Sequence, residues 1–131
     1  MKGRQFDHID LRVKEVVAAK RFYAELLPAL GFTVDSSGEE WCIWQAPGEG
    51  PVAFFGFTEE SQHRPNENRI AFWAESRPEV DRIAAIVRQA GGLNLEGPQL
   101  WREYSPGYYA FFFEDPSGNK LEVCCRQSLV A

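Results

Sequence analysis

The sequence predicts an α+β protein made of two copies of a strand–helix–three-strand unit. Three observations predict this class: the alternation of apolar and polar residues in several short segments, two amphipathic helical stripes, and a repetition of the whole pattern half-way along the chain. In the repetition, His8 corresponds to Arg69 and Gly31 corresponds to Gly92. Two copies are too few for a solenoid, so we expect two tandem βαβββ modules.

The size and charge of the chain exclude several classes of protein. With 131 residues and 44% hydrophobic residues, the chain has the length and composition of one globular domain. A formal net charge of −5 argues against binding to nucleic acid, which favours a basic surface. No segment approaches the roughly 20 apolar residues of a membrane span, and the first residues do not resemble a signal peptide. We therefore expect a cytoplasmic protein without a membrane partner.

The elements of the first copy follow in order from residue 8. Residues 8–13 alternate polar and apolar side chains, as expected for a strand with one apolar face. From Glu15 to Leu30 apolar residues recur every three or four positions, which predicts an amphipathic helix that Gly31 ends. Turns rich in glycine and proline then separate three expected strands, at residues 32–35, 41–45 and 52–57.

A polar segment at about residues 59–67 separates the two copies. It has few apolar residues, which is typical of a linker at the surface. The boundary between the modules is expected near Pro65. We therefore expect a single domain over residues 1–131, with the first module at about residues 6–58 and the second at about residues 68–126.

The second copy repeats the order of elements. A strand is expected from Arg69, and Ser76 followed by Glu79 fits a capping box at the start of a helix that stops at Gly91. We expect a short apolar run near Leu93 and then a loop over residues 97–107. Two further strands, YYAFFFE and LEVCCR, flank the turn sequence DPSGNK.

Three segments together resemble a known family. HIDLRV opens the first copy, RIAFWAE opens the second, and DPSGNKLEV lies near the C-terminus; over residues 6–126 the chain is similar to the vicinal oxygen chelate superfamily. That superfamily includes glyoxalase I, bleomycin- and fosfomycin-resistance proteins and extradiol dioxygenases. The resemblance implies a curved, mostly antiparallel eight-stranded sheet with the helices outside and a cavity for metal and ligand inside. It also implies a homodimer.

The resemblance also implies four metal-ligand positions, and this chain keeps only two ligands. His8 and Glu122 match the family's first-strand histidine and last-strand glutamate. The third position is Arg69, whose guanidinium has no lone pair for a metal, and the fourth falls near Ala53 or Phe54. We therefore expect an incomplete metal set, and we favour the absence of a cofactor over a bound divalent metal.

Strand alternation predicts which side chains line the cavity. Aromatic residues of the loop before the YYAFFFE strand are expected to close it, because their rings have polar tips. Arg69 is expected either to form an ion pair with Glu122, with His8 beside them, or to hold an anionic ligand. The predicted ligand-binding residues are Asp10, Arg12, Arg69, Trp73, Trp101, Tyr104 and Tyr109, beside His8, Ala71, Glu122 and Cys124 on the same faces.

Two functions of different classes remain open on the sequence. The first is a protein that binds a small organic ligand, aromatic or anionic, without a metal. The second is a metal-dependent lyase, isomerase or dioxygenase that acts on vicinal oxygens through His8 and Glu122, with Asp10 as a further possible ligand. A metal-free enzyme that uses His8 or Glu122 as general acid or base is a third alternative. The three cysteines, Cys42, Cys124 and Cys125, are expected to be free thiols.

Overall fold

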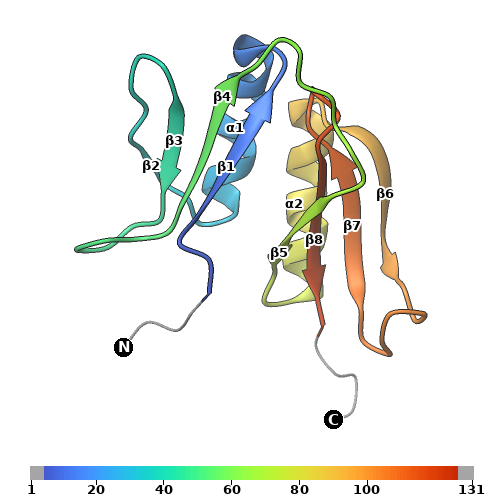
Figure 1. Ribbon diagram of the computed structural model, residues 1–131. Coiled ribbons are helices and arrows are strands. Elements are labelled where there is room, and N and C mark those ends of the chain that lie inside the picture. Colours follow the sequence, from blue (N-terminus) through green and yellow to red (C-terminus); the bar gives the residue numbers. More distant parts are fainter. Residues whose placement is uncertain (1–4, 127–131) are drawn as a thin grey trace. The chain divides into compact units, whose positions relative to one another are not determined.

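The computed structural model describes residues 5–126, and these form two compact units divided between Arg64 and Pro65. Each unit contains one helix and a four-stranded sheet, and the order of elements in both is β-α-β-β-β (Figure 1). The predicted α+β class with two βαβββ modules is therefore confirmed. The eight strands, however, form two hydrogen-bonded sheets of four strands, one in each unit.

The first unit contains a mixed sheet in the strand order β1-β4-β3-β2. Strand β1 pairs in parallel with β4, while β3 pairs antiparallel with both β4 and β2. The parallel pair needs a crossover connection, and helix α1 belongs to it. The strands are β1 (His8–Val13), β2 (Val34–Asp35), β3 (Cys42–Gln45) and β4 (Phe54–Glu59), and the helix is α1 (Val16–Ala29).

Helix α1 buries its apolar stripe against one face of this sheet. The aromatic ring of Tyr23 lies 4.8 Å from that of Phe57 and 5.2 Å from that of Phe55, measured between centroids. Glu15 caps the helix, because its carboxylate accepts hydrogen bonds from the backbone N–H groups of Val17 and Ala18.

The second unit repeats this topology in the strand order β5-β8-β7-β6. Strand β5 pairs in parallel with β8, and β7 pairs antiparallel with both β8 and β6. The strands are β5 (Arg69–Trp73), β6 (Leu93–Leu100), β7 (Tyr109–Glu114) and β8 (Lys120–Cys125), and the helix is α2 (Arg77–Ala90).

Helix α2 begins and ends at the residues that the sequence predicts. The Ser76 side chain accepts a hydrogen bond from the backbone N–H of Glu79 at 3.3 Å. At the other end Gly91 adopts a left-handed conformation with φ of 91°, which glycine adopts without steric cost. Neither helix in the described part of the chain is long and apolar enough to cross a membrane.

Strand β6 is longer than the sequence predicts. The residues from Gly97 to Leu100 are expected in a loop, but they continue the strand. Their pairing with β7 is irregular, with register shifts between Leu93 and Glu96 and again between Glu96 and Gln99. Since β6 is an edge strand, a proline at position 98 removes no hydrogen bond that the sheet needs.

Candidate functional site

The sheet of the second unit has one face toward α2 and one face without a helix. Val80, Ile83 and Val87 of α2 are fully buried, as are Phe111 and Val123 of the sheet. The other face carries the alternate residues of the same strands. In the register of β5, β8 and β7, Ala71 is paired with Glu122 and Glu122 with Phe112, while Trp73 is paired with Cys124 and Cys124 with Ala110. This helix-free face contains the candidate site.

A buried turn sets the start of β8 and so the position of Glu122. Asp115 is fully buried, and its carboxylate accepts hydrogen bonds from the backbone N–H groups of Ser117 (2.8 Å) and Asn119 (3.0 Å) and from the Asn119 side-chain amide (2.9 Å). Gly118 takes a φ of +88°, which the turn needs and other residues rarely adopt. The DPSGN segment is therefore a rigid connection between β7 and β8.

Glu122 is buried and accepts a hydrogen bond from a tyrosine. Its exposed fraction is 4%, and the hydroxyl of Tyr108 donates to its Oε2 atom. Burial, followed by this hydrogen bond, raises the pKa of Tyr108 well above its usual value. The phenol therefore keeps its proton at ordinary pH and supplies the donor that a buried carboxylate requires.

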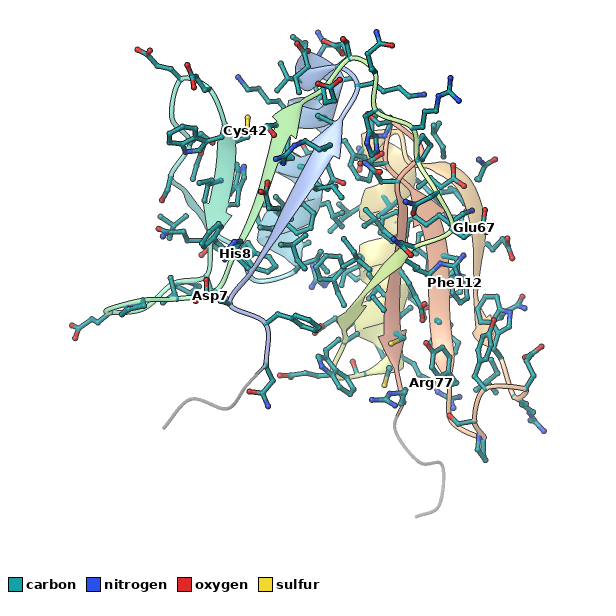
Figure 2. The ribbon with its side chains drawn as sticks, in the orientation of Figure 1. Asp7, His8, Cys42, Glu67, Arg77 and Phe112 are labelled. Carbon is teal, nitrogen blue, oxygen red and sulfur yellow. The ribbon has the colours of Figure 1, made fainter. Side chains whose placement is uncertain are left out.

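The guanidinium of Arg69 contacts an aromatic ring and not Glu122, and the alternative expectation, that it holds an anionic ligand, stays a prediction. The guanidinium carbon lies 4.6 Å from the centroid of the Phe112 ring, a cation–π contact, and Figure 2 labels Phe112 on β7. Among the described residues no ion pair joins Arg69 to Glu122, so the predicted ion pair is not formed. The physical reason is that Tyr108 already satisfies the carboxylate, while the aromatic ring beside it accommodates the cation.

The donor set of the second unit does not fit a divalent metal. Arg69 offers no lone pair, and the Glu122 carboxylate is engaged by Tyr108. Within residues 5–126, no three His, Cys, Asp or Glu side chains are grouped so that they could hold a metal ion. A catalytic metal usually needs three protein ligands and an open position.

A recess of about 230 Å³ opens on the helix-free face of the second unit. Trp73 is 71% exposed there, and the guanidinium carbon of Arg126 lies 4.7 Å from the centroid of its ring. Cys124 is 7% exposed, and burial raises the pKa of its thiol. The recess is lined by Ala71, Phe72, Trp73, Tyr108, Cys124 and Arg126.

The three aromatic residues predicted to close the cavity, Trp101, Tyr104 and Tyr109, lie in different places. Trp101 packs edge-on against Phe112 with 4.7 Å between ring centroids, and Tyr104 packs against Tyr108 at 5.1 Å. These contacts place both side chains beside the helix-free face. Tyr109 instead donates a hydrogen bond of 2.6 Å to Asp81 of α2, which places it on the helix side of the sheet.

The predicted residues of the first unit line a recess of their own, of about 250 Å³. The His8 ring stacks on Phe54 at 4.3 Å, and its Nδ1 atom lies 2.7 Å from Oδ1 of Asp7 (Figure 2). Asp10 and Arg12 form an ion pair of 2.6 Å. The lining consists of His8, Ile9, Asp10, Arg12, Trp41, Cys42, Ile43, Phe54, Gly56, Phe57 and Thr58.

Two residues that line the recess, Tyr108 and Arg126, are not in the predicted ligand-binding set, although Tyr108 is one of the aromatic residues near the loop that the sequence marks as able to contact a ligand. Arg126 continues the series of every second residue that begins with Glu122 and Cys124. Strand alternation therefore also predicts that Arg126 lies on the helix-free face. Tyr108 precedes Ala110 by two positions in the same way. Its partner could not be predicted, because a hydrogen bond between residues 14 positions apart depends on the pairing of β7 with β8.

The chain is similar to known proteins over most of its length. The family model described as Glyoxalase/Bleomycin resistance protein/Dioxygenase superfamily matches residues 5–123. The uncharacterized protein YqjT of Bacillus subtilis (strain 168) is 31% identical in an alignment of 126 residues that covers 88% of this chain and 94% of that protein.

Solved structures share the fold. A glyoxalase/bleomycin resistance protein from Albidiferax ferrireducens T118 is 26% identical, with a TM-score of 0.74, over 93% of this chain and 98% of that chain. A fosfomycin resistance protein from Mesorhizobium loti is 15% identical, with a TM-score of 0.68, over 98% of this chain and 96% of that chain, and this likeness shows the fold alone. The extent of the family match establishes that the chain belongs to the glyoxalase/bleomycin resistance protein/dioxygenase superfamily.

Proposed function

We propose that the protein binds a small planar organic ligand with an anionic group in the recess of the second unit. The observation that carries the proposal is the pair formed by Trp73 and Arg126 at this recess, with 4.7 Å between guanidinium and ring centroid. An exposed indole offers a flat apolar surface, and a guanidinium is the donor best suited to a carboxylate or phosphonate. The recess thus combines aromatic side chains with one cation and a few polar groups, as small-molecule sites commonly do.

Charge on the helix-free face supports an anionic ligand. Two acidic groups there are engaged: Glu122 accepts from Tyr108, and Glu114 forms an ion pair of 3.4 Å with Lys120. Arg126 contacts an aromatic ring, and a guanidinium in such a contact still has N–H groups able to donate to an anion. An anionic ligand in the recess would therefore meet the Arg126 cation, and no carboxylate is among the residues that line the recess.

Isothermal titration calorimetry with planar aromatic carboxylates, such as phenylacetate and indole-3-acetate, tests the proposal, with their amides as neutral controls. We expect the acids to bind more tightly than the amides. We expect Trp73→Ala and Arg126→Gln each to weaken binding about tenfold, the loss of one stacking or charge-assisted contact.

Arg88→Gln is the matched control for Arg126→Gln. Its guanidinium also lies over an aromatic ring, Phe111, at 5.7 Å, but on the helix side of the sheet. We expect this variant to bind the acids as the wild-type protein does. Equal weakening by Arg88→Gln and Arg126→Gln, or no binding of any acid, would contradict the proposed function.

A further inference from the structure

The buried carboxylate of Glu122 stands at a position where the family resemblance implies a metal ligand, yet its partner is a phenol. At 4% exposure the carboxylate needs a cation or a hydrogen-bond donor, since a buried charge without one is costly. The donor in this chain is the hydroxyl of Tyr108. Arg69 stands at another position where the resemblance implies a metal ligand, and its guanidinium contacts the ring of Phe112.

The surrounding side chains hold the tyrosine in this place. Tyr108 packs against the cluster formed by Ala110, Phe112 and Cys124, and its backbone N–H and C=O form hydrogen bonds with Ser105 and Trp101. Tyr104 contacts its ring from the loop side. The hydroxyl is therefore fixed on Glu122 by packing on two sides and by the backbone, and Tyr108 lines the recess.

We propose that the Tyr108 hydroxyl takes the place at Glu122 that the family resemblance assigns to a metal ion, and that the recess consequently offers its ligand a phenol oxygen instead of a Lewis acid. A metal ion attracts the lone pairs of ligand oxygens. A phenol whose single proton is directed at a carboxylate has only lone pairs left to offer, so it attracts an O–H or N–H donor. The ligand class narrows to planar aromatic anions that carry a hydroxyl or N–H group, and this part of the inference depends on the proposed function.

The metal part is tested with chelator-treated protein titrated with Mn²⁺ by calorimetry. Arg69→His supplies an imidazole on the face of Glu122, and Tyr108→Phe removes the competing hydroxyl. We expect no stoichiometric binding by the wild-type protein, and we expect Arg69→His/Tyr108→Phe to bind Mn²⁺ at least about tenfold more tightly than Arg69→His alone.

Arg69→His/Tyr109→Phe is the matched control, because it removes a tyrosine–carboxylate hydrogen bond on the opposite face of the sheet. We expect it to behave as Arg69→His does. Stoichiometric Mn²⁺ binding by the wild-type protein that is lost in Glu122→Gln would overturn the proposal. Equal affinities of Arg69→His and Arg69→His/Tyr108→Phe, including no binding by either, would overturn it as well. Circular dichroism checks the fold of each variant, and if the double variant is unfolded the ligand comparison decides.

The ligand part compares 4-hydroxyphenylacetate with 4-methoxyphenylacetate on the wild-type protein. One hydrogen bond corresponds to an affinity ratio of up to about tenfold in favour of the hydroxyl compound, and Tyr108→Phe should abolish this ratio. If both compounds bind equally and both depend on Trp73, the proposed function stands and the phenol proposal fails. If neither binds, the proposed function fails, and the Mn²⁺ titrations alone decide the role of Tyr108.

Discussion

The hydroxyl of Tyr108 donates a hydrogen bond to the buried carboxylate of Glu122, across the antiparallel pair of β7 and β8. One position along the chain, Tyr109 donates an equivalent hydrogen bond to Asp81, but on the opposite face of the sheet and to an exposed carboxylate. The two neighbouring tyrosines thus make the same chemical contact in a buried and in an exposed setting. This pair allows the energetic value of the Glu122 contact to be measured against an internal control.

We expect Tyr108→Phe to lower the free energy of unfolding by about 2–3 kcal/mol, because it leaves a buried carboxylate without its donor. Tyr109→Phe should cost less than about 1 kcal/mol, since water can replace the lost hydrogen bond at exposed Asp81. Urea denaturation followed by circular dichroism measures both values. Equal losses in the two variants would show that the burial of Glu122 contributes nothing.

The turn between β7 and β8 provides a second test. Asp115→Ala removes the acceptor of three hydrogen-bond donors inside the protein and should destabilise it by about 3 kcal/mol or more. Asp35 makes the same contact with the N–H group two residues later, at Ser37, in an exposed turn. Asp35→Ala is therefore the control, and a loss below about 1 kcal/mol is expected in thermal or urea denaturation. A similar loss at both turns would contradict the assigned role of burial.

Stability should fall at alkaline pH in a way that depends on Tyr108. Because its pKa is raised in the folded protein, the folded state keeps the phenol proton that the unfolded state loses above about pH 10. The contribution of the protonated Tyr108 to the free energy of unfolding is fully present below that pH, and it is lost as the pH rises further. Urea denaturation at pH 8 to 11 should therefore show a steeper decline for the wild-type protein than for Tyr108→Phe. Exposed Tyr104 supplies the control, and Tyr104→Phe should keep the steep decline.

The cysteines should react slowly with alkylating reagents. All three are free and buried, and burial raises the pKa of Cys42 and of Cys124, so the reactive thiolate is scarce at neutral pH. We expect native protein at pH 7.5 to be labelled by iodoacetamide much more slowly than protein unfolded in urea, with the native rate rising as the pH passes 9. Mass spectrometry of the labelled peptides measures each site. Rapid labelling of native Cys124 at pH 7.5 would contradict the prediction.

The order of elements could be predicted from local patterns alone. Alternation over residues 8–13, the stripe after Glu15 and the Ser76–Glu79 cap each depend on neighbours within a few positions, and all three are present as expected. The strand at Gly97–Leu100 was missed because glycine and proline usually indicate a loop, whereas an irregular edge strand accommodates them. Alternation also assigns Trp73 and Glu122 to one face, which the strand register bears out.

Contacts between those elements could not be predicted from the sequence. The sequence alone shows that Glu122 needs a partner and that Arg69 is a cation on the same face, so it predicts either an ion pair between them or an anionic ligand held by Arg69. Only the pairing of β8 with both β7 and β5 shows that Tyr108 reaches the carboxylate and that the Arg69 guanidinium contacts Phe112. The physical reason is that the periodicity of a strand determines the side on which a residue lies, whereas its partner on that side depends on register and packing between segments distant in the chain.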